Sequence, residues 1–485
     1  MNAPARAGQR VAVIGAGAAG LCAAKNLLAR GVEVVVYELG SCIGGLWVYD
    51  NDNGIAPAYQ SLHLNSETRV TEYRDFAFPA DGPLYPDHAG VRRYLEAYAA
   101  KFDIARHIRF RSKVVDVAPH GARWRVTLAP GGAAALDKTS DADLGNGMGN
   151  GMGNGTAANE FDAVIVASGH QGMPSHPGWR KDFAGEYLHS HTYRVPEPFR
   201  GKRVLVVGMG NSAVDIASDI CVVTQSTTIS ARSPVLVMPR MLFGVPTSRV
   251  LARIEKKWLP WPVRRSVREL LVRIVHGTME QWGFVTPKSR THPTSHPSLM
   301  SHFVWNRIKA RPGIESVKGH EVRFVNGHTE TFDTIIAGTG YSVDLPFLAP
   351  ALRPLDGHRL ELFLRVVAPN PSHRGLYFTG LFNVAGGGNI RMMDDQAEYI
   401  TELICGDVML PDAARMHRTM EEEQAFMKHE FPGSPRYALE LDPPFYRRQL
   451  ARERKRGWVR APGSTHAAAP ANSTKQQGAD RVVAR

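Results

Sequence analysis

The hexapeptide Gly15-Ala16-Gly17-Ala18-Ala19-Gly20 determines the fold expected for this chain. It follows a short apolar run and opens a segment whose apolar residues recur with helical spacing, and a β-rich run comes next. Gly15 allows a tight turn, Gly17 lets the backbone approach a pyrophosphate, and Gly20 lets helix and strand pack closely. The helix N-terminus adds N–H groups for phosphates. The stretch therefore predicts a strand, turn, helix and strand that bind a dinucleotide, against the alternative of an ordinary glycine turn.

Glu38 stands at the end of the next predicted strand, 18 residues after Gly20. A carboxylate at that place accepts hydrogen bonds from an adenosine ribose, whereas it would repel a 2′-phosphate. The first site is therefore expected to bind FAD or NAD rather than NADP.

A second fingerprint, Gly208-Met209-Gly210-Asn211-Ser212-Ala213, lies between a predicted strand, 203–207, and a predicted helix, 212–221. The strand that follows ends without an acid, and Arg232 stands there instead. A guanidinium can hold a 2′-phosphate through two hydrogen bonds, so this site is expected to bind NADPH. The alternative for Arg232 is a solvated surface charge, and Arg240 is a weaker candidate for the phosphate-binding role.

The repeated unit predicts an α/β protein with two Rossmann-like dinucleotide-binding domains, the NADPH domain being inserted in the FAD domain. Composition predicts a surface loop at the Gly/Asn/Met-rich residues 143–160 and a disordered tail at residues 461–485, because neither segment has enough large apolar groups to repay the ordering entropy. The expected bounds are 1–180 for the first part of the FAD domain, 195–325 for the NADPH domain with an Arg/Trp-rich insertion at about 241–301, and 326–460 for the return segment of the FAD domain.

Composition and charge exclude several other classes of protein. The 485 residues, 43% of them apolar, suffice for two or three cores, and the net charge of +12 is concentrated in two segments, 249–290 and 447–460. Without a groove-reading motif, two local basic patches do not indicate a nucleic-acid partner. No apolar run approaches the roughly 18 residues needed to cross a bilayer, and the N-terminus lacks an apolar signal segment. A cytoplasmic location is therefore expected.

Two nucleotide sites of opposite charge preference imply electron flow from NADPH to a flavin. A disulfide reductase would need two cysteines beside the flavin, and Cys42 has no close partner in the sequence. Molecular oxygen is then the natural electron acceptor.

The linker 183–193 reads F-A-G-E-Y-L-H-S-H-T-Y, with Phe183, Gly185, His189 and Tyr193 at the fixed places of an F-x-G-x-x-x-H-x-x-x-Y pattern. In this pattern the chain resembles the flavin-containing monooxygenases, which are single-component (class B) FAD/NADPH enzymes. The resemblance runs from about residue 10 to residue 458. Typical Baeyer–Villiger members carry Trp at the last place, so the chain resembles the N- and S-oxygenating branch more closely, although some members of that branch oxidise ketones.

The resemblance also implies a reactive centre at Asn65, which falls where the family has an Asn facing the flavin and the nicotinamide. Its neutral amide can donate a hydrogen bond to the oxygenated flavin, and the alternative role is a turn or cap residue. Thr68 stands where the family commonly has Lys, which leaves the size and polarity of the substrate open. The fingerprints and the resemblance together predict these cofactor-binding residues: Gly15, Gly17, Ala18, Ala19, Gly20, Glu38, Leu46, Trp47, Asn65, Ser66, Gly208, Gly210, Asn211, Ser212, Ala213, Asp215, Arg232, Asp394 and Gln396.

Asp394 and Gln396 lie in a helix predicted from about residue 392 to residue 404, after the glycines 386–388. In this flavoprotein class the start of such a helix points its positive end at the flavin ring. Asp394 stands where relatives usually carry Glu, and the alternative is an ordinary residue of the first helical turn.

The implied reaction transfers one oxygen atom from O2 to a small organic substrate. The resemblance implies that NADPH reduces FAD, that O2 adds to form a flavin C4a-hydroperoxide, and that a nucleophilic nitrogen or sulfur takes the oxygen. No metal is required. Two alternatives remain open, namely Baeyer–Villiger oxygenation of a ketone and a non-oxygenating flavoprotein that serves as a redox or docking partner.

The basic insertion contains one predicted amphipathic helix. We expect this helix to pack its apolar stripe on its own domain and to solvate its charges, the alternative being a peripheral contact with a membrane. His292, His296 and His302 lack a metal-binding pattern and predict a surface or substrate-facing loop. An oligomer is left open. The stripe comprises Val263, Val267, Leu270, Leu271 and Ile274, with Arg264, Arg265, Arg268 and Arg273 beside it.

Overall fold

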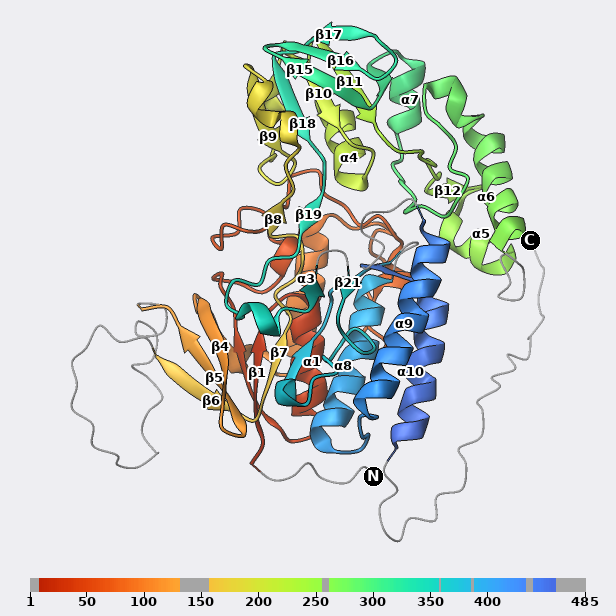
Figure 1. Cartoon of the computed structure of the whole chain (residues 1–485). Helices are drawn as coiled ribbons and strands as arrows, with labels where there is room; N and C mark the ends of the chain where they lie inside the picture. Colours follow the sequence, from red (N-terminus) through yellow and green to blue (C-terminus); the bar gives the residue numbers. More distant parts are fainter. Residues whose placement is uncertain are drawn as a thin grey trace, which may run out of the picture.

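The computed structural model describes residues 8–130, 157–254, 261–356, 359–384, 388–432 and 439–458. Figure 1 shows two units, one above the other, each built on a five-stranded sheet. The lower unit combines the red N-terminal and the blue C-terminal segments of the chain, whereas the upper unit is made of yellow and green segments from its middle (Figure 1). The upper unit is therefore inserted in the lower one, as predicted.

The lower sheet has the order β22-β7-β1-β2-β3, and all its pairings are parallel. Val11 and Val13 of β1 and the buried side chains of helix α1 belong to one apolar core, which also includes residues of α3 and α8. The predicted strand, turn, helix and strand are confirmed. The bounds are Arg10–Ile14 (β1), Ala18–Leu28 (α1), Glu33–Tyr37 (β2), His88–Lys101 (α3), Ile108–Arg109 (β3), Ala163–Val166 (β7), Leu376–Phe378 (β22) and Asn389–Cys405 (α8).

The upper sheet repeats this plan with the order β14-β11-β10-β18-β9, again with parallel pairings. Helix α4 follows β10 directly and buries Val214, Ile216 and Ile220 against the sheet. The second unit of the sequence prediction is thus confirmed as well. The bounds are Glu186–His189 (β9), Arg203–Val207 (β10), Asn211–Ile220 (α4), Ser226–Ala231 (β11), Leu299–Val304 (α7), Ile308–Pro312 (β14) and Thr334–Ala337 (β18).

The expected bounds of the upper domain, 195–325, are too narrow at both ends. β9 precedes residue 195 and β18 follows residue 325, yet both are strands of the upper sheet. β18 pairs with β10 on one side and β9 on the other, so its hydrogen bonds place it inside this sheet. Residues 183–193 therefore contribute a strand to the upper unit in addition to linking the two units.

Two small antiparallel sheets flank the parallel ones, β4-β5-β6 below and β15-β16-β17 above (Figure 1). The loop predicted over 143–160 is wrong at its C-terminal end, because 158–160 belong to β6 and pair residue by residue with β5. Pairing satisfies the backbone of this segment, and the adjoining Phe161 is fully buried. Residues 143–156 and the predicted tail 461–485 lie outside the described residues. The bounds are Val114–His120 (β4), Arg123–Leu128 (β5), Ala158–Phe161 (β6), Ile314–Lys318 (β15), Glu321–Phe324 (β16) and Thr329–Thr331 (β17).

Short elements and further helices complete the described chain. Helices α9 and α10 stand beside α8 in the lower unit, and α5 and α6 extend from the upper unit toward the top of α10 (Figure 1). The helices are Thr68–Thr71 (α2), Thr247–Ile254 (α5), Trp261–His276 (α6), Ala413–Glu430 (α9) and Pro443–Gly457 (α10), and the two-residue strands are Met173–Pro174 (β8), Met241–Leu242 (β12), Val245–Pro246 (β13), Tyr341–Ser342 (β19), Leu355–Asp356 (β20), Arg359–Leu360 (β21), Asn383–Val384 (β23) and Glu440–Leu441 (β24).

Helix α6 does not bury the face that its sequence predicts. Leu270 and Ile274 of the apolar stripe are 57% and 61% exposed, whereas Val272 is 2% exposed. Arg265 lies seven residues before Val272, on the same helix face, and its guanidinium bonds the Lys288 carbonyl and Glu269. Three residues of the stripe, Val263, Leu270 and Ile274, are exposed, whereas Val267 and Leu271 are half-buried. The prediction that the stripe packs on its own domain is wrong for the three exposed residues.

In the described part of the chain, no helix combines the length and the apolarity that a membrane span requires. The exposed residues of the α6 stripe are compatible with the alternative of a peripheral membrane contact, which stays a prediction.

Candidate active site

The first glycine turn has the geometry that a dinucleotide site requires. Gly15 has φ of +109°, and a Cβ on Gly20 would lie 1.8 Å from the Gly15 carbonyl oxygen. Gly17 faces Gly45 so closely that a Cβ on Gly45 would lie 3.1 Å from the Gly17 Cα. Side chains at these places would fill the cradle or break the turn, so the residues fit a bound pyrophosphate.

Glu38 is buried directly beneath this turn. Its Oε2 accepts from the Ala16 amide at 2.7 Å, and its Oε1 accepts from the Gly40 amide at 2.8 Å. The carboxylate therefore holds the turn itself. Because each carboxylate oxygen can accept a second hydrogen bond, Glu38 retains acceptor capacity for the ribose hydroxyls that it is predicted to bind.

The second glycine turn, in the upper unit, has a similar geometry to the first. Gly208 has φ of +118°, and a Cβ on it would lie 2.4 Å from the Gly338 carbonyl oxygen. Asn211, at the start of α4, accepts from the Ser295 amide at 3.2 Å, and the Thr294 hydroxyl bonds the Met209 carbonyl. Residues 294 and 295 of the basic insertion are thus tied to the second turn. No motif in the sequence of the insertion indicates this contact.

Arg232 directly follows β11, and its side chain is exposed. A Cβ on Gly313 would lie 3.3 Å from the Arg232 Cα, so the absence of a side chain at residue 313 gives Arg232 room. An exposed arginine at the carboxyl edge of this sheet is compatible with the predicted contact to a 2′-phosphate.

Asn65 lies where the two units meet. Its side chain is exposed, and its Oδ1 accepts a long hydrogen bond from Arg240 Nη2 at 3.4 Å. Since a guanidinium can only donate, this contact fixes the amide oxygen toward Arg240 and leaves the amide NH2 to donate elsewhere. Arg240 directly precedes β12, so the basic insertion supplies the group that orients the predicted reactive amide.

Glu67, two residues after Asn65, holds the basic insertion in place. This carboxylate is 1% exposed, and it accepts from Ser248 Oγ at 2.9 Å and from Arg249 Nε at 2.6 Å. Both partners belong to α5. A buried carboxylate with two strong donors holds α5 against the segment that carries Asn65.

Asp215 joins the two units behind Asn65. It is 6% exposed on the second turn of α4, and Tyr59 of the lower unit donates a hydrogen bond to its Oδ2 at 2.6 Å. Its Oδ1 has no hydrogen-bond partner among the described residues and lies 3.7 Å from His296 Nε2. Burial raises the pKa of Asp215 to about 6 and lowers the pKa of His296 to about 3. Near neutral pH this pair therefore joins a neutral imidazole to a carboxyl group that is partly protonated.

Replacing Asp215 by Asn is expected to change how the stability of the protein depends on pH. Because the pKa of Asp215 is raised in the folded state, to about 6 from 3.8, the stability that its protonated form provides is complete below pH 4 and is lost as the pH rises through 6. The amide introduced by the substitution does not titrate. The free energy of unfolding of the variant, relative to the parent, should rise between pH 4 and pH 7 by up to about 3 kcal/mol. If the melting temperatures of the two proteins changed with pH in parallel across this range, the raised pKa of Asp215 would be contradicted.

The signature of the linker ties the two units together. Tyr193 is 1% exposed, and its hydroxyl bonds Asp219 Oδ2, which also accepts from Ser61 Oγ at 3.0 Å. His189 lies in β9, and its Nδ1 accepts from the His191 amide at 3.1 Å, which requires a neutral ring nitrogen. Burial lowers the pKa of His189 to about 4. A Cβ on Gly185 would lie 2.6 Å from the Asp333 carbonyl oxygen and from the ring of Phe183. These residues explain the signature as packing and linkage.

The other predicted residues of the lower site gather around the first turn. Ala18, Ala19 and Gly20 form the first turn of α1, and Leu46 and Trp47 belong to a short 3-10 helix, Gly45–Trp47, opposite Gly17. Ser66 precedes helix α2, and its hydroxyl bonds the hydroxyl of Thr71, the last residue of that helix, at 2.7 Å. In the upper unit, Gly210 caps α4, Ser212 follows Asn211, and Ala213 packs against Gly338.

Helix α8 begins earlier than predicted, which changes the place of Asp394. The helix starts at Asn389, so Asp394 lies on its second turn and is not a residue of the first turn. Asp394 is 2% exposed and accepts from Asn26 Nδ2 at 3.2 Å and from Arg74 Nε at 3.1 Å. Gln396 accepts from the Gly380 amide at 2.9 Å. Both side chains therefore bind protein groups. The residues 385–387 lie outside the described residues.

Sequence reasoning misses Tyr59, Glu67 and His296 as site residues, and it assigns Arg240 to a different role. No local motif surrounds any of them, since each acts on a residue far away in the chain. Nothing in the sequence around Glu67 indicates that this carboxylate is buried. The sequence predicts a loop at His296, and the place of this residue against α4 depends on how the insertion folds back.

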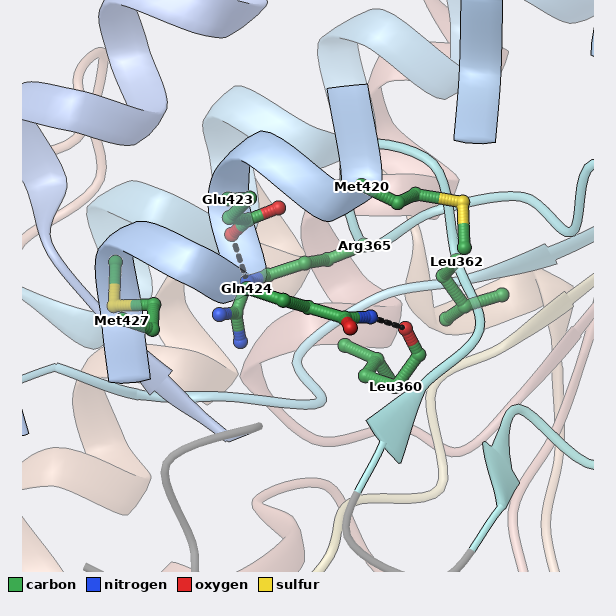
Figure 2. A pocket seen from close by; sticks show the side chains of 7 residues that line it. All are labelled: Leu360, Leu362, Arg365, Met420, Glu423, Gln424 and Met427. Carbon is green, nitrogen blue, oxygen red and sulfur yellow. Dashed lines mark hydrogen bonds and ion pairs between the residues drawn. The ribbon is translucent and has the colours of Figure 1, made fainter. Parts of the chain in front are cut away.

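A small cavity between β21 and α9 lies outside this region (Figure 2). Its volume of about 10 Å3 admits one water molecule at most. Figure 2 shows Arg365 bonded to Glu423 at 2.6 Å and Gln424 bonded to the Leu360 carbonyl at 3.1 Å, with Met420 and Met427 alongside. All these groups satisfy one another, so this cavity is a packing defect and not a substrate site.

Comparison with known proteins supplies the family. The family model described as flavin-binding monooxygenase-like matches residues 8–442. Flavin-containing monooxygenase 5 of Oryctolagus cuniculus is 29% identical over 455 residues, which cover 90% of this chain and 81% of that protein.

Solved structures share the fold. S-allyl-L-cysteine S-oxygenase from Allium sativum matches with a TM-score of 0.65 and 23% identity, covering 93% of this chain and 90% of that one. Cyclohexanone-bound cyclohexanone monooxygenase matches with a TM-score of 0.62 and 16% identity, covering 93% and 98%. The chain thus belongs to the flavin-binding monooxygenase-like family, and it is a flavin-dependent oxidoreductase of the monooxygenase class.

Proposed function

We propose that this enzyme oxygenates a nucleophilic nitrogen or sulfur of a small organic molecule. The observation that supports this most directly is the exposed amide of Asn65, held at Oδ1 by Arg240 where the two dinucleotide-binding units meet. Reduced flavin supplies the activated oxygen when FAD is bound. The chain itself needs to exclude water and to present a hydrogen-bond donor that does not titrate.

FAD would be held in the lower unit by the first glycine turn, by Glu38 and by the segment of Leu46 and Trp47. NADPH would be held in the upper unit by Gly208 and Gly210, by the start of α4, and by Arg232. The glycine contacts described above support both assignments, because a Cβ on Gly20 of the first turn or on Gly208 of the second would clash with a backbone carbonyl and disrupt the turn. Asn65 lies at the junction of the two units that would hold these cofactors.

A soft nucleophile is favoured over a ketone by the chemistry of the site. Asn65 is neutral, and attack of an amine or a sulfide on the transferred oxygen requires no protein base. The relative from Allium sativum carries S-oxygenase in its name. Baeyer–Villiger oxygenation remains the second candidate, because the cyclohexanone enzyme shares the fold at a similar TM-score.

Product analysis with a sulfide and a ketone separates the two reactions. Purified enzyme loaded with FAD would be given NADPH, O2 and either thioanisole or cyclohexanone, and products would be identified by mass spectrometry with 18O2. The expected product is the labelled sulfoxide, with little lactone. A labelled lactone as the main product would favour the ketone reaction, and NADPH consumption that yields hydrogen peroxide alone with every substrate tried would favour a non-oxygenating flavoprotein.

A further inference from the structure

Arg240 is a half-buried cation at the junction of the two units. Among the residues that the structure describes, its buried Nε has no hydrogen-bond acceptor, and Nη2 makes a 3.4 Å contact to Asn65 Oδ1. Its guanidinium carbon stands 5.3 Å from the centre of the Tyr85 ring. Burial lowers the pKa of Arg240, which reports the cost of holding this charge away from water.

No carboxylate neutralises Arg240 within ion-pair distance in the part of the chain that the structure describes. Asp215 interacts with Arg240 at longer range, but its carboxyl group accepts from Tyr59 at 2.6 Å and titrates near neutral pH. The histidine near Arg240, His296, is neutral. By contrast, Arg249 of the neighbouring helix α5 is paired with Glu67. Arg240 is thus a cation that has no carboxylate in direct contact among the described residues, although the charge of Asp215 acts on it at longer range.

A half-buried charge of this kind is stabilised when an anion binds to it, and a planar guanidinium forms paired hydrogen bonds with a carboxylate or a phosphate. The contact to Asn65 places this anion site beside the predicted reactive amide. NADPH phosphates are expected elsewhere, at the start of α4 and at Arg232. We infer that Arg240 binds a carboxylate of the substrate, so that the enzyme prefers anionic, carboxylate-bearing sulfides or amines. This inference rests on the proposed function for the identity of the reacting atom.

The test compares two nearly isosteric substrates, 3-(methylthio)propanoate and 3-(methylthio)propanamide, which differ in charge alone. The parent holoenzyme should show a kcat/KM about tenfold or more higher for the carboxylate, a size typical of a hydrogen-bonded charge pair. In Arg240→Gln this ratio should fall toward one, mainly through KM, and Arg240→Lys should restore part of it. The ratio within each variant corrects for any change in the orientation of Asn65.

Arg200→Gln is the matched control, because it removes one positive charge from an exposed arginine of the same unit that has no assigned role, and it should leave the ratio between the two substrates unchanged. Binding of 3-(methylthio)propanoate to enzyme loaded with FAD and NADP+, measured by calorimetry, gives a readout that does not depend on turnover. Weakened binding in Arg240→Gln would support the carboxylate site even if neither sulfide were oxygenated, in which case the proposed function alone would fail.

Three results would overturn the inference. The first is an equal preference for the two substrates in the parent enzyme together with no detectable binding of the carboxylate. The second is an unchanged preference in Arg240→Gln. The third is a rise of the KM for NADPH in Arg240→Gln with the substrate ratio preserved, which would assign Arg240 to the cofactor.

Discussion

Replacing Asn65 by Ala is expected to lower the rate of product oxygenation by about 100-fold, the usual effect of removing one preorganised donor from a reacting centre. NADPH oxidation should continue, because the turn residues that hold both cofactors lie elsewhere. The electrons would then appear as hydrogen peroxide. Oxygenated product and peroxide, both measured per NADPH consumed, report this uncoupling directly.

A second variant distinguishes the loss of the hydrogen-bond donor of Asn65 from the loss of its contact with Arg240. Asn65→Asp keeps an oxygen for Arg240 to bind and removes the NH2 donor. It should therefore uncouple the enzyme as strongly as Asn65→Ala. Gln60→Ala is the control, since this neighbouring side chain is exposed. If Asn65→Asp kept the parent's ratio of product to peroxide, Asn65 would be a residue that positions the insertion and not a donor at the reacting centre.

The fold could be predicted because its decisive signals are local. Each glycine turn, with the strand before it and the helix after it, is encoded within about 30 residues, and both units form as expected. The domain bounds could not be predicted in the same way. β18 lies over 100 residues from β9, and only their hydrogen bonds show that both belong to the upper sheet.

The residues of the candidate site also differ in whether a local sequence pattern predicts them. Residues on the glycine turns can be found from the sequence, because the chemistry of phosphate binding dictates their types. Tyr59 and Asp215 are 156 residues apart, and their hydrogen bond depends on how the two units meet. Helix α6 shows a further limit, because its apolar stripe predicts the buried face, yet Leu270 and Ile274 of the stripe are exposed and Val272, outside the stripe, is buried.

Replacing Arg232 by Gln should change the choice between the two pyridine nucleotides. If Arg232 binds the 2′-phosphate, its loss removes charge-assisted hydrogen bonds that NADPH makes and NADH does not, which corresponds to about a 10- to 100-fold rise in the KM for NADPH. The KM for NADH should change little. Steady-state NADPH and NADH oxidation, measured side by side, gives the ratio of kcat/KM for the two nucleotides.

Arg200→Gln is the matched control for this prediction, because Arg200 is an exposed arginine of the same unit and lies before β10, away from the end of β11. A general loss of positive charge would affect both variants alike, through weaker long-range attraction of the phosphate groups. A specific contact would affect Arg232→Gln alone. If the nucleotide preference of Arg232→Gln equalled that of the parent while Arg240→Gln lost it, the 2′-phosphate would have to lie on Arg240, and the anion site beside Asn65 would belong to the cofactor.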